Sequence, residues 1–143
     1  MRIRVKKVND KAMLPTKAYE MDACFDLCSV ENVEIPPGMR VPVSTGLQLA
    51  IPEGYEGQIR PRSGISLRTP LLIANSPGTI DSGYRGDIKI ILFNTSISDT
   101  LTVGIGDRIA QLAILPVLDV VFEETDKLEK TERSNKGFGS TGK

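Results

Sequence analysis

Short runs of alternating or continuous apolar residues recur along the chain and predict β-strands. Residues 2–8 alternate between polar and apolar side chains with the period of two of a half-buried strand. Residues 88–93 and 109–121 are rich in the β-branched and aliphatic side chains that favour strands. Glycine and proline separate such runs at 36–38, 52–54, 76–78, 82–83 and 104–106. This spacing predicts an all-β fold, a distorted β-barrel or jelly roll.

A single short helix is expected near residues 63–68. Ser63 is the candidate N-cap, because its hydroxyl can accept a hydrogen bond from an amide of the first turn. Pro70 is expected to end the helix, because the residue before a proline avoids the helical region.

The length of 143 residues fits one domain, and the composition changes only near the end. From Glu123 onward the chain is first charged and then rich in glycine, serine and threonine, which is typical of a mobile segment. We therefore expect residues 1–125 to form the β-barrel and residues 126–143 to form a mobile C-terminal arm of that same domain.

Charge and hydropathy narrow the set of partners. The chain has 18 Lys and Arg and 18 Asp and Glu residues, which disfavours a basic surface for nucleic acid. No apolar run approaches the ~20 residues of a membrane helix, and residues 1–10 lack the apolar stretch of a signal peptide. We expect a soluble cytoplasmic protein with no membrane or nucleic-acid partner, in which Cys24 and Cys28 are reduced thiols.

The sequence contains no histidine, which excludes a Ser-His-Asp mechanism, His-ligated zinc and an imidazole base. Carboxylates therefore become the leading candidates for a general base. Asp81, on a predicted hairpin over residues 75–87, either caps the hairpin or deprotonates a water. Asn75 offers the donor and acceptor that a uracil edge requires. Tyr84 either belongs to the core or lies beside a sugar, where it would reject a bulkier ribose.

Residues 61–64 form a candidate anion site. A cation, a hydroxyl and a glycine amide meet there in Arg62, Ser63 and Gly64. The alternative is an ordinary turn with a solvated arginine.

Residues 106–112 combine charged and apolar side chains. Asp107 and Arg108 are candidates for a structural ion pair. Gln111 is expected on the strand face opposite to its apolar neighbours, where it needs either a backbone or a ligand partner.

Residues 133–143 combine cations, hydroxyls, glycines and one aromatic side chain. Glycine amides can converge on an anion, and Ser140 and Thr141 add hydroxyl donors. Residues 137–143 match most of a P-loop pattern, but no strand precedes them and no helix follows. Phe138 can stack on a planar base as a lid. The alternative is a disordered tail that only increases solubility.

Together, five segments resemble in order the motifs of the β-fold deoxyuridine triphosphate nucleotidohydrolases, or dUTPases. They are DACFDL (22–27), PRSGIS (61–66), GTIDSGYRG (78–86), GDRIAQL (106–112) and GFGSTG (137–142). The resemblance spans almost the whole chain and implies hydrolysis of dUTP to dUMP and pyrophosphate, which keeps uracil out of DNA.

The resemblance also implies a role for each matching position. Asp81 would activate the water that attacks the α-phosphorus, and Tyr84 would lie beneath the deoxyribose. Uracil would be read by Asn75 and by the backbone of Gly78, Thr79 and Ile80. The other substrate contacts would come from Arg62, Ser63, Gly64, Lys89 and Gln111, and from Arg133, Phe138, Gly139, Ser140 and Thr141 of the closing arm. Asp26 would contact Mg²⁺ through water, with the metal held mainly by phosphate oxygens, as its preference for oxygen ligands suggests.

The same resemblance implies a homotrimer with sites shared between subunits. Two alternatives stay open: an enzyme similar to dCTP deaminase, and a catalytically silent nucleotide-binding module of the same fold. Turnover of dCTP would favour the first alternative. Tight dUTP binding without pyrophosphate release would favour the second.

Overall fold

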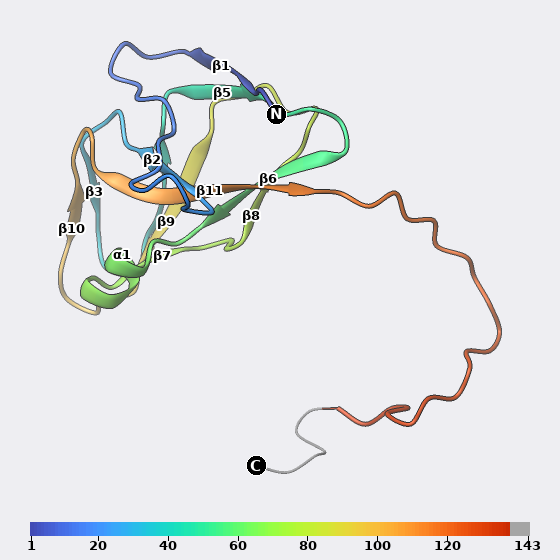
Figure 1. Ribbon diagram of the computed structural model, residues 1–143. Helices are drawn as coiled ribbons and strands as arrows, with labels where there is room; N and C mark the ends of the chain where they lie inside the picture. The colour runs from blue at the N-terminus through green and yellow to red at the C-terminus, as the bar shows by residue number, and fades with distance from the viewer. Residues whose placement is uncertain (138–143) are drawn as a thin grey trace.

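The computed structural model describes residues 1–137, which form eleven short strands and one helix (Figure 1). The prediction of an all-β fold with one short helix is confirmed. In chain order the elements are β1 (Arg4–Lys7), β2 (Phe25–Cys28), β3 (Val33–Ile35), β4 (Arg40–Ser44), β5 (Leu47–Ala50), β6 (Tyr55–Arg60), α1 (Ser63–Arg68), β7 (Leu71–Ile73), β8 (Gly78–Ile80), β9 (Lys89–Asn94), β10 (Leu101–Val103) and β11 (Arg108–Pro116).

The strands form four antiparallel sheets. The largest has the order β2-β11-β6-β8, and a second sheet has the order β4-β9-β7. The pairs β1-β5 and β10-β3 complete the fold, and none of the sheets formed by residues 1–137 closes into a barrel. The jelly-roll-like architecture therefore consists of open sheets that share one core.

Apolar side chains on the inner faces of these sheets make up that core. In β9, Ile90 and Leu92 are buried whereas Lys89 and Ile91 point outward, as the period of two requires. In β11, Ala110 and Leu112 are buried on either side of the half-buried Gln111. Each fully buried aliphatic side chain stabilises the fold by about 1.5–3 kcal/mol. The opposite faces are thus left free for polar side chains.

The helix α1 occupies the predicted residues, but its expected cap is wrong. Arg62, with an extended backbone, is the N-cap and makes no side-chain capping bond, while Ser63 is already the first helical residue. The extended backbone ends at Arg62, so the helix begins at Ser63, one residue earlier than a Ser63 cap requires. The other end agrees with the prediction, because Thr69 is the C-cap and Pro70 follows it.

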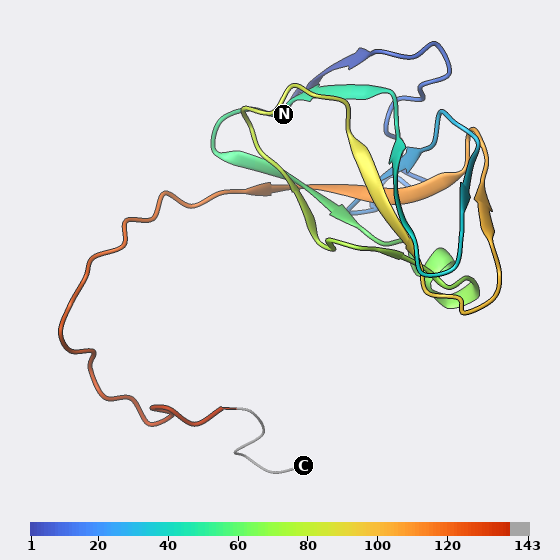
Figure 2. The same cartoon turned by 180° about the vertical axis from the view of Figure 1, so that it is seen from behind.

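The chain leaves the sheets after β11. The apolar run predicted to continue to residue 121 ends as a strand at Pro116, and the last ladder-like contact is the Val117 amide donating to the Gly54 carbonyl at 2.9 Å. Residues 117–137 contain no strand or helix and run away from the body in two opposite views (Figures 1 and 2). The proposed closing arm, residues 126–143, therefore stays a prediction.

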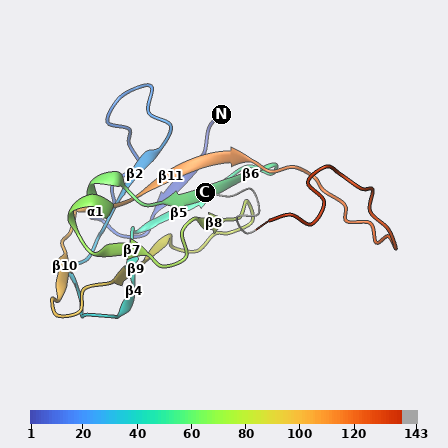
Figure 3. The ribbon, with the colours of Figure 1, turned by 90° about the horizontal axis from the view of Figure 1, so that it is seen from below.

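The helix and the start of the C-terminal segment lie at opposite ends of the molecule. Seen from below, α1 lies near the start of β11, and the chain continues from the far end of that strand (Figure 3). No helix within residues 1–137 has the length and apolar character needed to cross a membrane.

The two cysteines, both free, have different surroundings. Cys28 is buried, whereas Cys24 is partly exposed. Burial, together with the nearby Asp26 carboxylate, raises the pKa of the Cys28 thiol. The reactive thiolate is therefore scarce at Cys28 near neutral pH.

We predict that iodoacetamide at pH 7.5 labels Cys24 well before Cys28. Mass spectrometry of tryptic fragments over time measures the two rates, and a Cys24→Ser variant serves as the control in which only slow labelling remains. Equal labelling rates in the folded protein would contradict the described burial.

Candidate active site

A basic pocket lies beside the start of α1 and has a volume of about 460 Å³. We call it the arginine pocket. Its lining includes Asp22, Cys24, Asp26, Arg62, Ser63, Gly64, Arg68, Arg108 and Gln111. Three guanidinium groups outnumber the two carboxylates, so the pocket suits an anion.

Asp26 holds two of the three guanidinium groups of this pocket. Its Oδ1 accepts a hydrogen bond from Arg62 Nε at 2.7 Å, and its Oδ2 accepts one from Arg108 Nη1 at 3.2 Å. A second Arg62 bond, from Nη2 to Oδ2, measures 3.4 Å. These contacts link three strands that are far apart in the sequence, because Asp26 lies in β2, Arg62 follows β6 and Arg108 begins β11.

The prediction of an ion pair between Asp107 and Arg108 is wrong. Within residues 1–137, Arg108 pairs with Asp26, while Asp107 Oδ2 accepts a hydrogen bond from the Gly104 amide at 2.7 Å. The physical reason is the turn at residues 104–106, which uses the Asp107 carboxylate to satisfy its own backbone.

Gln111 lies on the polar face of β11, as predicted. It is directly opposite Asp26 of β2 on one side and Arg60 of β6 on the other. Its Nε2 donates to the Pro61 carbonyl at 2.8 Å, so the partner that the sequence demanded is a backbone group. Gln111 therefore supports the turn that delivers Arg62 to the arginine pocket.

Sequence reasoning missed two cations of this pocket, Arg68 and Arg108. Arg68 lies four residues after Gly64 in α1, and its Nε donates to the Gly64 carbonyl at 3.2 Å. The helical spacing of the two residues was a usable signal. The role of Arg108 depends on the pairing of β2 with β11, which no local pattern reveals.

A second pocket, of about 530 Å³, is formed by β8, the loop that follows it and β9. The prediction of a hairpin over residues 75–87 is wrong, because β8 pairs with β6 whereas β9 pairs with β4 and β7 in another sheet. We call it the tyrosine pocket. It brings together several predicted substrate contacts, namely Thr79, Ile80, Asp81, Tyr84 and Lys89, together with Asp87, which the sequence did not single out.

One tight turn connects Asp81 to Tyr84. The Tyr84 amide donates to the Asp81 carbonyl at 3.0 Å. The Tyr84 side chain is 45% exposed, so its alternative placement in the core is wrong. No group of residues 1–137 donates to the Asp81 carboxylate, so the capping role considered for it has no support and the carboxylate can accept a proton.

Asn75 lies in the loop before β8 and outside the lining of the tyrosine pocket. It contacts the bare backbone of Gly78, where an added Cβ would come within 3.1 Å of Asn75 Nδ2. Gly78 thus leaves the room that the amide occupies. The position of Asn75 is consistent with reading a planar edge at the start of β8.

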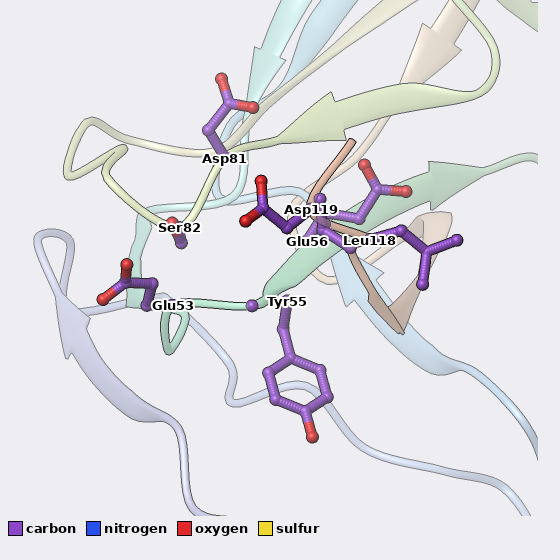
Figure 4. Close-up of a pocket in the computed structure, with 9 residues that line it drawn as sticks. Glu53, Tyr55, Glu56, Asp81, Ser82, Leu118 and Asp119 are labelled. Atoms are coloured by element: carbon purple, nitrogen blue, oxygen red, sulfur yellow. The ribbon is translucent and has the colours of Figure 1, made fainter. Parts of the chain in front are cut away.

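A third hollow, of about 480 Å³, adjoins the other side of Asp81. We call it the acidic pocket. Figure 4 shows the carboxylates of Glu53, Glu56, Asp81 and Asp119 around it, with the Tyr55 ring turned away from Asp81. Asp81 is thus the residue shared by the tyrosine and acidic pockets.

The arginine and tyrosine pockets have no lining residue in common. Asp26 is level with Arg60 on β6, whereas Asp81 is nearly level with Glu56, and β2 and β8 are the two edges of the sheet. Strand rise and strand spacing together separate Asp26 and Asp81 by on the order of 20 Å. One chain therefore does not bring its two candidate half-sites together.

Of the candidate residues near the C-terminus, Arg133 lies within the described residues. Arg133 is exposed in a turn in which the Lys136 amide donates to the Arg133 carbonyl at 3.0 Å. The arm residues Phe138, Gly139, Ser140 and Thr141 lie outside the described residues.

The described residues do not form a metal site by themselves. Residues 1–137 contain no group of three or more Asp, Glu, Cys or His side chains arranged to hold a metal. Asp26 already accepts three bonds from arginines, and a carboxylate offers about four lone pairs. The remaining lone pair fits one donor such as a water, which agrees with an indirect metal contact and not with direct ligation.

Comparison with known proteins gives one consistent family. The family model described as dUTPase matches residues 10–142. A deoxyuridine 5'-triphosphate nucleotidohydrolase of Wolinella succinogenes is 48% identical over 143 residues and covers 100% of this chain, which covers 95% of that protein. A protein of the same description from Clostridium novyi is 46% identical over 142 residues, with 99% of both chains covered.

Solved structures give the same result. The dUTPase of Staphylococcus bacteriophage 80alpha, with dUpNHpp, has a TM-score of 0.89 at 30% identity and covers 99% of this chain and 98% of its own. A variant dUTPase from phage phi11 of S. aureus has a TM-score of 0.85 at 27% identity, covering 91% of this chain and 100% of its own. That structure reveals the coordination of a structural Mg(II) ion in the phage protein.

The arginine pocket yields a prediction about stability. The Arg62 side chain is 24% exposed and close to Asp26, whereas the Arg108 side chain is 54% exposed and more distant. We expect Arg62→Ala to lower the free energy of unfolding by about 1–3 kcal/mol, and Arg108→Ala to lower it by less than ~1 kcal/mol. Urea denaturation at one fixed protein concentration measures both, and a larger loss for Arg108→Ala would contradict the geometry.

Proposed function

The chain belongs to the dUTPase family, and from this premise we propose that it cleaves dUTP to dUMP and pyrophosphate through a water activated by Asp81. The observation that carries the mechanism is the Asp81 carboxylate, free of hydrogen bonds from residues 1–137, at the mouth of the tyrosine pocket. In physiological terms, the reaction removes dUTP and so keeps uracil out of DNA.

The proposed step is a hydrolytic substitution at the α-phosphorus. Asp81 accepts a proton from water while the water oxygen forms a bond to the α-phosphorus. The bond from that phosphorus to the bridging oxygen of the β-phosphate breaks, and pyrophosphate leaves with the bonding electron pair. Water supplies all the atoms that the products gain, so no further reactant is needed.

The tyrosine pocket would hold the nucleoside. Asn75 and the backbone of Gly78, Thr79 and Ile80 would read the uracil edge, because Thr79 is exposed and Ile80 half-buried on β8, and the Asn75 amide lies against the backbone of the buried Gly78. The Tyr84 ring would lie against the deoxyribose and exclude a 2'-hydroxyl by its bulk. Lys89, exposed at the start of β9, would contribute a cation to the same pocket.

The arginine pocket would hold the phosphates. Arg62, Ser63, Gly64 and Gln111 line it, and the guanidinium groups of Arg62 and Arg108 are held in place by Asp26. Such preorganised donors bind phosphate oxygens without first having to be ordered. Arg133, Phe138, Gly139, Ser140 and Thr141 would then close over base and triphosphate as an arm.

We propose a homotrimer whose sites combine the arginine pocket of one copy with the tyrosine pocket of another. Two observations support shared sites: the two pockets are separated within one chain, and apolar side chains are exposed after β11. Val121 and Phe122 are 88% and 96% exposed, which is unusual for large apolar side chains that have no partner.

Mg²⁺ is the metal we propose, bound mainly by phosphate oxygens, where it would withdraw negative charge from the triphosphate. Asp26 would contribute through a water that uses its remaining lone pair. A cytoplasmic location is proposed as well, in keeping with the two free cysteines.

The role of Asp81 gives the most direct mutational prediction. Asp81→Asn should lower kcat for dUTP by at least ~100-fold, the scale of a lost general base, with little change in the Kd of dUTP. Pyrophosphate release and calorimetric binding measure the two quantities. Asp119→Asn removes a neighbouring carboxylate of the acidic pocket and is the matched control, which should keep its turnover.

Unchanged turnover in Asp81→Asn would remove this residue from the mechanism. A wild-type protein that binds dUTP tightly and releases no pyrophosphate would instead favour the silent module. Ammonia release from dCTP would favour the deaminase alternative.

The arm gives a separate prediction. A chain ending after Lys130 lacks Arg133 and the glycine-rich motif but keeps every strand and α1. We expect it to retain its thermal unfolding temperature within a few degrees and to lose nearly all dUTP turnover, because the arm closes the site and adds nothing to the core. Loss of the folded state on truncation would show that the segment is part of the core.

A further inference from the structure

The Tyr84 ring is held in place by its own loop. Its hydroxyl donates to the Asp87 carbonyl at 3.2 Å, so the side chain folds back along the loop that carries it. The ring lies over Gly86, where an added Cβ would collide with the phenol. The position of the ring in the tyrosine pocket therefore depends on where the backbone of Gly86 and Asp87 lies.

That backbone is fixed by the turn between β4 and β5. The Ile88 carbonyl accepts hydrogen bonds from the Thr45 amide at 3.0 Å and from Thr45 Oγ1 at 2.7 Å. The Ile88 amide donates to the Leu47 carbonyl at 2.8 Å. Thr45, Leu47 and Ile88 are fully buried, so these bonds anchor the end of the Tyr84 loop inside the core.

One contact in this anchor is made by side chains alone. Ser44 Oγ donates to Asp87 Oδ2 at 2.6 Å. The hydroxyl has its direction set by its surroundings, because Ser44 Oγ also accepts from the Gly46 amide at 3.0 Å. The Ser44 amide in turn donates to Glu31 Oε1 at 2.6 Å, which holds the serine itself.

The other oxygen of Asp87 makes this contact unusually important. Asp87 Oδ1 is buried and has no hydrogen-bond partner among residues 1–137. Within that range, the Ser44 hydroxyl is thus the one side-chain donor to the Asp87 carboxylate. Without it, a half-buried carboxylate with one buried oxygen would have no donor among residues 1–137, a costly state that the loop can relieve by turning Asp87 toward solvent.

We propose that Ser44 and Asp87 are positioning residues for sugar discrimination, because they hold the backbone on which Tyr84 rests. Neither residue needs to touch the nucleotide. The proposal rests on the proposed function, in which Tyr84 excludes the 2'-hydroxyl of a ribonucleotide. Displacement of the loop opens space beside the sugar, so kcat/KM for UTP rises relative to kcat/KM for dUTP.

The test compares kcat/KM for dUTP and for UTP in the full-length protein. Ser44→Ala should lower the dUTP/UTP ratio by ~10-fold or more, the scale of discrimination that one excluded group provides. Ser44→Thr keeps the hydroxyl and should restore the ratio. Ser96→Ala is the matched control, since its hydroxyl also accepts from backbone amides, in a loop remote from the tyrosine pocket.

A second pair of variants tests the same contact from the other side. Asp87→Asn keeps an acceptor oxygen for Ser44 and should retain the ratio, whereas Asp87→Ala should lower it as Ser44→Ala does. This pair also serves if Ser44→Ala fails to fold, because alanine at position 87 leaves no buried carboxylate oxygen without a donor.

The outcomes separate this proposal from the proposed function. A wild-type protein that hydrolyses dUTP and UTP equally would overturn the proposed sugar selectivity itself. A selective wild type, with Ser44→Ala less stable to heat but unchanged in its dUTP/UTP ratio, would overturn only the positioning role and leave a structural hydrogen bond.

Discussion

The pairing of β6 between β11 and β8 is the constraint on which the candidate site depends. It orders the polar face of the largest sheet so that Asp26, Gln111 and Arg60 share one row, while Glu56 and Asp81 lie near the other end. The same register that creates the arginine pocket places the base of the proposed reaction at a distance from it. A single copy thus carries two separate pockets that share no lining residue.

Each of the two pockets is stiffened by contacts within the protein that form without substrate. Asp26 holds two arginines on one side, and the turn at Ser44–Thr45 anchors the Tyr84 loop on the other. Groups held in this way lose little further freedom when a nucleotide binds. The Asp81 carboxylate has no such support from residues 1–137, and in the proposed reaction it has to remain available to water.

Local signals in the sequence predicted the all-β fold, three strand-forming segments and the helix, whereas the substrate roles of residues such as Thr79 and Lys89 were implied by the family resemblance. The β-branched and aliphatic side chains of residues 88–93 indicated β9, the alternation around Gln111 indicated its strand face, and the Pro70 stop indicated the end of α1. The Arg108 partner and the anchor of Asp87 were beyond such reasoning, since both join residues that are far apart in the chain. The Ser63 cap failed for a local reason, the extended backbone that continues to Arg62.

The central claim is that one site needs residues of two copies, and subunit mixing tests it most directly. Asp81→Asn and Arg62→Gln, each nearly inactive alone, would be unfolded together, refolded as a mixture and assayed for pyrophosphate release from dUTP. If sites are shared, some sites in the mixed oligomers combine an intact Asp81 from one copy with an intact Arg62 from another, and activity reappears. A mixture no more active than the two separately refolded variants would show that each chain completes its own site.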